Sequence, residues 1–290
     1  TSGSLFLNLT SFTTARDNLR QMTLDLLNLN ASLGTMDLDD DGNPDFDTNN
    51  VYFIGHSLGA IDGLPFVAIN NSEAVQMGAF TSQPFIKAAA ALNTGGGTVR
   101  LLTNSPSLGP TILGGLAAAS DSLVQGNSGL ESYLNVFQGI MDSADVMNFA
   151  SMLSEAAGTN TGVLLTEVIG DGTSDNPADQ TIPNAADDIW GTPPLSTTVS
   201  TTGFVIDNFP APLAGTEPML AQFNPDLSSA PGDDTDRDVL VTRFTDGNHA
   251  TPASADEPLA FAEIAAQIFS FFNQDGNVST SIVTNTDIVE

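Results

Sequence analysis

Residues 51–59 read VYFIGHSLG, and this stretch decides the fold. Its first four residues, Val51–Ile54, are apolar and β-branched or aromatic, which is typical of a strand buried on both faces. The next five residues match Gly-x-Ser-x-Gly, a pattern that places a serine on a tight turn between a strand and a helix. The following segment, Leu58–Asn70, reads as helical until Pro65 interrupts it. Strand, turn and helix in this order predict that Ser57 is a nucleophile projecting above the end of a sheet.

The rest of the chain alternates between helical and strand patterns. The spacing of apolar residues in Thr13–Leu33 predicts an amphipathic helix whose buried stripe consists of Leu19, Met22, Leu26, Leu29 and Leu33. Strands are predicted at Thr161–Ile169 and Asp238–Phe244, and a last helix at Glu257–Phe272. This alternation predicts an α/β fold with a mainly parallel sheet and helices on both faces.

The composition narrows the class of protein. The 290 residues include 35 acidic and only 6 basic ones, for a formal net charge of −29. Such a field repels nucleic acid, so we expect no nucleic-acid partner. Cysteine is absent, which excludes disulfides and a thiol nucleophile. No apolar run is long enough to span a bilayer, so we expect no transmembrane segment. An acidic, lysine-poor chain favours a secreted or salt-adapted protein.

A serine nucleophile needs a base, and the chain has two histidines. His56 adjoins Ser57, so its side chain should point away from the nucleophile and serve a structural role. His249 is therefore the base by elimination. It follows a predicted strand and precedes the last helix. The backbone N–H of Leu58, directly after the serine, is the predicted oxyanion donor.

The third member of a triad orients the histidine and stabilises its charged form. In the chain order Ser, Asp, His it should lie in the loop after the strand ending at Ile169. Three aspartates in this loop compete: Asp171, Asp175 and Asp179. Asp179 is favoured because its pattern Asp-x-x-Ile-Pro resembles the acid loop common among proteins with this serine turn, and Asp175 is second.

An acidic loop precedes the first strand. Residues 37–45 read DLDDDGNPD, which places oxygen ligands at alternate positions and a glycine at the turn, as calcium requires. The predicted ligands are Asp37, Asp39, Asp41, Asn43 and Asp45. Position 12 is Thr48 rather than Glu, so the loop is not a complete EF-hand. We expect a structural calcium ion, with a solvated acidic turn as the alternative, and no cofactor for catalysis.

Several further segments carry a family resemblance. They are ARDNLRQ at 15–21, GGG at 95–97, SPSLGP at 105–110, DQTIPN at 179–184 and GTEP at 215–218. With the serine turn, they resemble the secreted or surface-exposed lipases and lysophospholipases (VolA-type) of marine gamma-proteobacteria, over most of residues 1–275. The resemblance implies an α/β-hydrolase fold, a bacterial extracellular location and ester hydrolysis on lipids. Related enzymes cleave polyesters.

Lipases and lysophospholipases of this family usually have several strands and a His-Gly oxyanion loop before the serine. We therefore expect N-terminal strands of the domain to be missing here and to act as a partner, with a shorter sheet that uses a different backbone amide as the alternative.

The expected organisation has four parts. Residues 1–104 form the sheet core with the acidic loop and the serine turn. Residues 105–157 form an apolar helical insert that either caps the site as a lid or is plain core. Residues 158–275 carry the acid and histidine loops, and 276–290 form a tail.

The predicted function is a serine carboxylic-ester hydrolase, a lipase or esterase working through an acyl-enzyme. Alternatives are a lysophospholipase or polyester hydrolase, an acyltransferase, and a non-catalytic calcium-binding or docking fragment of a larger surface protein.

Overall fold

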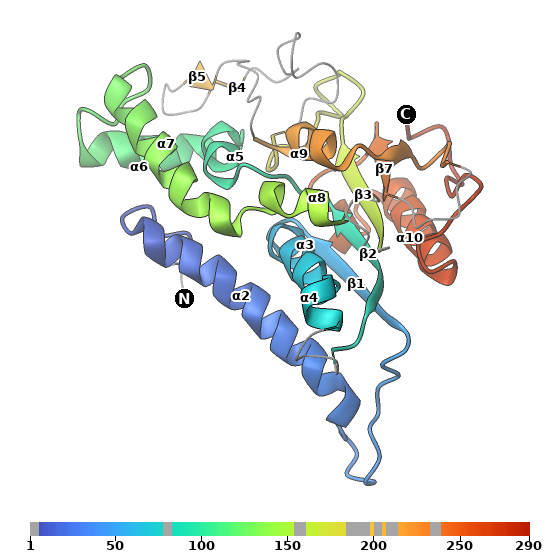
Figure 1. The fold of residues 1–290 in the computed structure, drawn as a ribbon. Helices are drawn as coiled ribbons and strands as arrows, with labels where there is room; N and C mark the ends of the chain where they lie inside the picture. Colours follow the sequence, from blue (N-terminus) through green and yellow to red (C-terminus); the bar gives the residue numbers. More distant parts are fainter. Residues whose placement is uncertain are drawn as a thin grey trace.

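A parallel sheet forms the framework of the molecule (Figure 1). The computed structural model describes residues 6–77, 83–153, 161–183, 214–232 and 239–290, and the backbone of 198–199 and 205–206. Within these residues the sheet order is β1-β2-β3-β7-β6, with every neighbouring pair parallel. The strands are β1 (Val51–His56), β2 (Ile86–Leu92), β3 (Gly162–Val168), β7 (Val239–Phe244) and β6 (Asp226–Leu227). A separate antiparallel pair joins β4 (Thr198–Val199) and β5 (Val205–Ile206).

Helices occupy the connections between these strands. The α-helices are α2 (Phe12–Ser32), α3 (Leu58–Asn70), α4 (Glu73–Gln76), α5 (Thr98–Asn104), α6 (Gly109–Ala119), α7 (Ser128–Met141), α8 (Ala150–Leu153), α9 (Thr216–Phe223) and α10 (Pro258–Asn273). Short 3₁₀ turns are η1 (Leu33–Thr35), η2 (Asp142–Ala144), η3 (Val146–Asn148) and η5 (Thr251–Ala253). The coarse prediction of an α/β fold with a mainly parallel sheet is confirmed.

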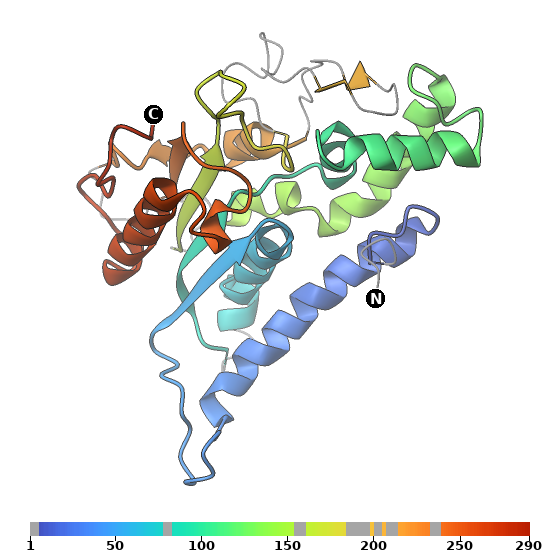
Figure 2. The ribbon, with the colours of Figure 1, turned by 180° about the vertical axis from the view of Figure 1, so that it is seen from behind.

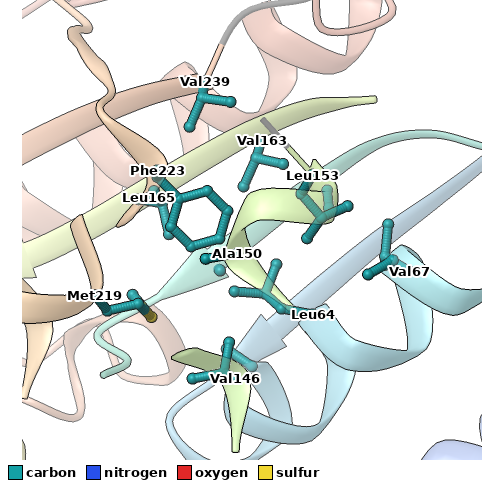
Figure 3. Close-up of a cluster of buried hydrophobic side chains, with 14 of the residues drawn as sticks. Leu64, Val67, Val146, Ala150, Leu153, Val163, Leu165, Met219, Phe223 and Val239 are labelled. Atoms are coloured by element: carbon teal, nitrogen blue, oxygen red, sulfur yellow. The ribbon is translucent and has the colours of Figure 1, made fainter. Parts of the chain in front are cut away.

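Both faces of the sheet are covered, as a parallel sheet requires. Alternate strand residues such as Val163 and Leu165 pack under α3, α8 and α9 in one core (Figure 3). Their neighbours, such as Leu164 and Leu240, pack under α10 in the other core. Seen from behind, α10 and α3 lie on opposite sides of β1 (Figure 2). This two-sided burial explains the continuous apolar runs of β3 and β7. The expectation that Val51–Ile54 is buried on both faces is wrong, because β1 lies at the edge of the described sheet, where Ile54 is 55% exposed and Val51, Tyr52 and Phe53 are half-buried.

A third apolar cluster joins α2 to α5, α6 and α7. Leu113, Leu134 and Phe137 of the predicted helical insert are buried there, and Phe12 of α2 stacks on Phe137. The acyl-binding lid role of residues 105–157 stays a prediction, as does the division of the chain into four parts.

Helix α3 continues through Pro65, where the sequence predicts an interruption. Pro65 removes the N–H that would bond to the Ile61 carbonyl, at a cost of about 3 kcal/mol in a helix interior. Leu64 and Val67 on either side are fully buried in the main core. Tertiary packing of both faces of the helix outweighs the local cost.

The buried stripe of α2 is also corrected. Leu29 is 50% exposed, while Asn30 is buried. The Asn30 side-chain amide donates to Asn70 Oδ1 at 2.8 Å and to the Pro84 carbonyl at 2.8 Å. A polar contact between segments distant in sequence thus sets the rotation of this helix end, which leucine spacing does not reveal.

The C-terminal segment 276–290 packs on the core. Val278, Ile282 and Ile288 are buried beneath α10 and β7. Buried Glu263 of α10 accepts a hydrogen bond from Thr284 N at 2.9 Å and another from the Thr284 hydroxyl. This buried carboxylate ties residues 276–290 to the last helix.

Candidate active site

The turn after β1 has the geometry that a nucleophile elbow requires. Ser57 lies at φ 54° and ψ −122°, a strained conformation for a residue other than glycine. Its N–H donates to the Leu92 carbonyl at 2.9 Å, which fixes the turn to β2. A Cβ on Gly55 would lie 2.6 Å from the Gly59 carbonyl oxygen, so strand and helix pass too closely for any side chain there. A Cβ on Gly59 would meet no atom within 4 Å, so only the first glycine of the motif is sterically required.

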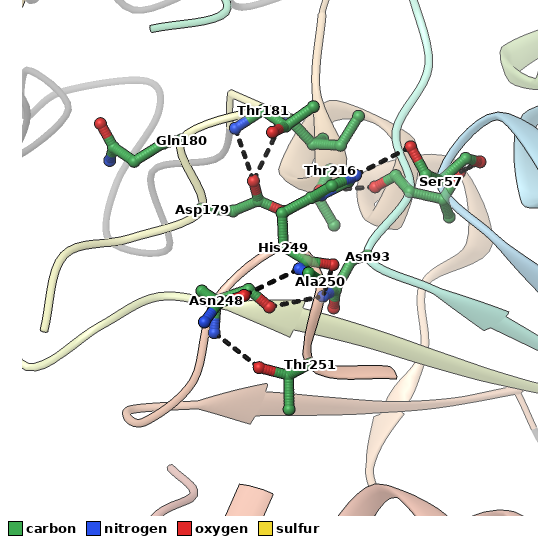
Figure 4. A network of polar contacts seen from close by, with 12 residues as sticks. Ser57, Asn93, Asp179, Gln180, Thr181, Thr216, Asn248, His249, Ala250 and Thr251 are labelled. Carbon is green, nitrogen blue, oxygen red and sulfur yellow. Dashed lines mark hydrogen bonds and ion pairs between the residues drawn. The ribbon is translucent and has the colours of Figure 1, made fainter. Parts of the chain in front are cut away.

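Ser57, His249 and Asp179 form one continuous hydrogen-bonded chain (Figure 4). His249 Nε2 lies 2.9 Å from Ser57 Oγ, and His249 Nδ1 lies 2.7 Å from Asp179 Oδ2. The serine follows β1, the aspartate follows β3 and the histidine follows β7. Because parallel strands end at the same edge of a sheet, three loops distant in sequence meet at this point.

The proton positions follow from the partners. A carboxylate accepts and cannot donate, so Nδ1 of His249 carries the hydrogen toward Asp179. In the neutral ring, Nε2 is then an acceptor, and the Ser57 hydroxyl donates to it. This tautomer is the one in which histidine can remove the serine proton.

The aspartate is held by the backbone of its own loop. Asp179 Oδ1 accepts hydrogen bonds from Thr181 N at 2.6 Å and Ile182 N at 3.0 Å, and the residue is 4% exposed. The competing Asp171 and Asp175 are exposed. The hydroxyl and N–H of Thr173 donate to Asp171 and lower the pKa of its carboxyl. The structure thus brings Asp179 to the histidine and leaves the two alternatives in the surface loop.

The predicted oxyanion donor lies at the start of a helix. Leu58 is the first residue of α3, directly after the serine. The first N–H groups of a helix have no intrahelical acceptor and carry the positive end of the helix dipole. The Leu58 N–H is therefore suited to hold a developing negative charge beside Ser57.

Two polar residues behind the triad were not singled out from the sequence. Asn93, after β2, and Thr166, on β3, are buried, and the Thr166 hydroxyl donates to Asn93 Oδ1 at 3.2 Å. Asn93 has φ 47°, a left-handed conformation that asparagine tolerates. An asparagine directly after an apolar strand and before Gly95–Gly97 is the sequence signal that could have located it.

The acidic loop brings together part of the predicted calcium set. One carboxylate oxygen from each of Asp37, Asp39 and Asp45 lies within 4.8 Å of the others. The predicted ligand Asp41 is not part of this carboxylate group, and its Oδ1 accepts a hydrogen bond from Asn43 N at 2.8 Å. Calcium binding by this loop stays a prediction.

Comparison with known proteins adds no family. No protein-family model, curated protein or solved structure matches the chain. Among the described residues, no helix combines the length and apolar character needed to cross a membrane.

Proposed function

We propose that this chain is a serine carboxylic-ester hydrolase. The observation that carries the proposal is the hydrogen-bonded chain from Asp179 through His249 to Ser57, assembled from three loops. A buried, doubly hydrogen-bonded carboxylate, an oriented imidazole and a serine on a strained turn are the parts that acyl transfer through a serine needs. An ordinary glycine-rich turn requires none of these contacts.

The reaction follows from these positions. Ser57 Oγ attacks the acyl carbon of an ester while His249 Nε2 takes the hydroxyl proton. Negative charge develops on the former carbonyl oxygen, where the Leu58 N–H donates. The intermediate collapses, the alcohol leaves with the proton from His249, and an acyl-enzyme remains. Water then attacks the acyl carbon, gives its proton to His249, and releases the acid and the free serine. Asp179 orients the ring and stabilises its charged form.

The fold that we propose for this site is the α/β-hydrolase fold. Nucleophile, acid and base follow parallel strands in the chain order Ser, Asp, His, which is the order of that fold. Within the described residues β1 lies at a sheet edge, and its Ile54 is 55% exposed. These observations support pairing of β1 with a further strand, which we propose belongs to the N-terminal part of the same domain.

The substrate class rests on the family resemblance. We propose acyl esters of lipids, with lysophospholipids and polyesters as alternatives, and an extracellular location. We propose that nucleic acid is not a substrate, because the net charge of −29 repels it. Acyl transfer to an alcohol uses the same acyl-enzyme and differs only in the second acceptor.

A fluorophosphonate probe tests the proposal directly, because it phosphonylates an activated serine. We expect a mass shift on Ser57 that is lost in Ser57→Ala and in His249→Ala. Product analysis of an ester with and without added alcohol separates hydrolysis from acyl transfer. A folded chain that the probe does not label refutes an activated serine and favours the non-catalytic binding fragment.

A further inference from the structure

The backbone carbonyl of His249 is held by donors from two neighbouring strands. His56 Nε2 lies 2.7 Å from this oxygen, and Asn93 Nδ2 lies 3.2 Å from it. Asn93 Nδ2 also lies 3.3 Å from the Asn248 carbonyl oxygen. A carbonyl oxygen only accepts, so His56 must carry its hydrogen on Nε2, and Asn93 must present its amide nitrogen. Both residues therefore act on the backbone of the base rather than on its ring.

These donors stand at the ends of two adjacent strands of the sheet. His56 is the last residue of β1, and Asn93 directly follows β2. His56 pairs in register with Leu92, and Leu92 pairs with Thr166 of β3. The Thr166 hydroxyl fixes the Asn93 amide by donating to its oxygen, which leaves the nitrogen pointing toward the histidine loop. The ends of β1 and β2 thus converge on one carbonyl, and β3 supports the Asn93 amide.

Other backbone hydrogen bonds beside His249 close within its own loop, while the ring is held by Asp179. Asn248 and Ala250, on either side of His249, are exposed. Asn248 N donates to Thr251 Oγ1 at 2.8 Å, and Thr251 N donates to the Asn248 carbonyl at 3.1 Å, so these bonds close within the loop. Within the described residues, the hydrogen bonds of His56 and Asn93 connect the backbone of Asn248 and His249 to the ends of β1 and β2.

The ring of His56 adds no charge to the site near neutral pH. Its centroid lies 4.9 Å from that of His249. Burial lowers the pKa of His56 below its ordinary value, which keeps the ring neutral. His249 can then become positively charged during the reaction without a second cation beside it.

We propose that His56 and Asn93 are positioning residues, which hold the His249 backbone so that its Nε2 stays within reach of Ser57 Oγ. This inference rests on the proposed function. It assigns to the histidine of the Gly-His-Ser-Leu-Gly turn a role in placing the base. The strand that delivers the nucleophile thereby also anchors the residue that activates it.

The kinetic test compares four variants with p-nitrophenyl butyrate as substrate. His56→Leu removes the donor, whereas His56→Gln restores an N–H at a similar reach. Asn93→Asp keeps the size of the side chain and, like asparagine, tolerates the left-handed backbone conformation at this position, but it removes the amide donor. Tyr52→Phe is the matched control, because it removes a hydrogen bond to Asp275 from the same strand, far from the triad.

We expect kcat and the fluorophosphonate labelling rate to fall at least about tenfold in His56→Leu and Asn93→Asp, because small misplacements of a catalytic group are costly. KM should stay within about twofold, since both residues contact the His249 backbone rather than the Ser57 hydroxyl that faces the substrate in the proposed reaction. His56→Gln should recover most of kcat, and Tyr52→Phe should behave like the parent. Parent kcat in His56→Leu, no recovery in His56→Gln, or an equal loss in Tyr52→Phe overturns the inference.

A spectroscopic test separates this inference from the proposed function. The chain has only two histidines, so ¹⁵N-histidine labelling gives two ring systems. The Nδ1–H of His249 that faces Asp179 should give a slowly exchanging proton signal in the parent and in His56→Gln. We expect this signal to broaden in His56→Leu. A sharp signal in all variants overturns the inference even if the chain has no esterase activity, while an unlabelled parent overturns only the proposed function.

Discussion

Replacing Asp62 with asparagine should remove a pH-dependent destabilisation of the fold. Asp62 lies on α3, five positions after Ser57, and is 1% exposed. Neither of its carboxylate oxygens has a hydrogen-bond partner. Burial without a partner disfavours the charged form, and it raises the pKa of Asp62 to about 7.

The sign and size follow from linkage. The pKa of Asp62 in the folded protein lies above its ordinary value of 3.8. Below pH 3.8 the carboxyl is protonated in both the folded and the unfolded protein, so it does not lower the free energy of unfolding. Above pH 7 it is ionised in both states, and the free energy of unfolding is lowered by the full amount. That penalty is roughly 4 kcal/mol, at about 1.4 kcal/mol per pKa unit. Between pH 5 and pH 8 it grows by roughly 2.5 kcal/mol. In Asp62→Asn the buried amide costs about 1–3 kcal/mol, but that cost does not change with pH.

Urea unfolding followed by circular dichroism at pH 5, 6, 7 and 8, at constant ionic strength, measures the effect. The free energy of unfolding of Asp62→Asn minus that of the parent should rise by roughly 2.5 kcal/mol across this range. Taking the difference cancels the carboxylates that the two proteins share. Asp121→Asn, at an exposed site, controls for the loss of one negative charge. A difference that is flat or falls with pH would refute the reasoning, because it would mean that Asp62 is solvated and ionised in the folded protein.

Three further predictions concern the site and its supports. Asp179→Asn should lower kcat for p-nitrophenyl butyrate by up to about 10⁴-fold, because the imidazole loses its orienting acceptor, whereas Asp175→Asn should keep the parent rate. Arg243→Met should lower the free energy of unfolding by about 3–5 kcal/mol in urea titrations. It strips the cation from Glu167, whose side chain is 0% exposed and lies 2.8 Å from Arg243 Nε. Calcium at 100 times its dissociation constant should stabilise the chain by about 2.7 kcal/mol, seen as a higher Tm. Asp39→Asn should abolish that shift, and a parent Tm that calcium leaves unchanged excludes the site.

The sequence predicts the elements whose signal is local. The nine residues 51–59 are enough to predict β1 and the turn at Ser57. The apolar runs of β3 and β7 predict these strands without knowledge of their neighbours in the sheet. The meeting of Ser57 with His249 follows from elimination, because the chain offers only two histidines. The contact of Asp179 with His249 agrees with the prediction from the pattern Asp-x-x-Ile-Pro at residues 179–183.

Elements set by distant contacts were not predictable in this way. Helix α5 begins after three glycines, and its first N–H groups are capped by buried Asp145, which lies 47 positions away from Thr98. Capping patterns predict helix starts only when the cap adjoins the helix. Helix α9 likewise lies inside a segment whose composition resembles a loop. The packing of residues 276–290 depends on Glu263, which the sequence presents as an ordinary helical acid.

Two residues with positive φ, Ser57 and Asn93, and one buried carboxylate, Asp62, lie near the start of α3 or the neighbouring strand end. Their contributions to the geometry of the site differ. The positive φ of Ser57 aims its hydroxyl at His249, and that of Asn93 aims an amide at the histidine loop, so each local cost of about 1–3 kcal/mol has a geometric result. The Asp62 carboxylate has no such result, because it contacts no polar group of the site. If Asp62→Asn gains stability at pH 8 and keeps the labelling rate of Ser57, its charge is separable from the reaction. If the labelling rate falls instead, the Asp62 charge affects the reactivity of Ser57. We would then infer that it does so through α3, whose first N–H is the proposed oxyanion donor.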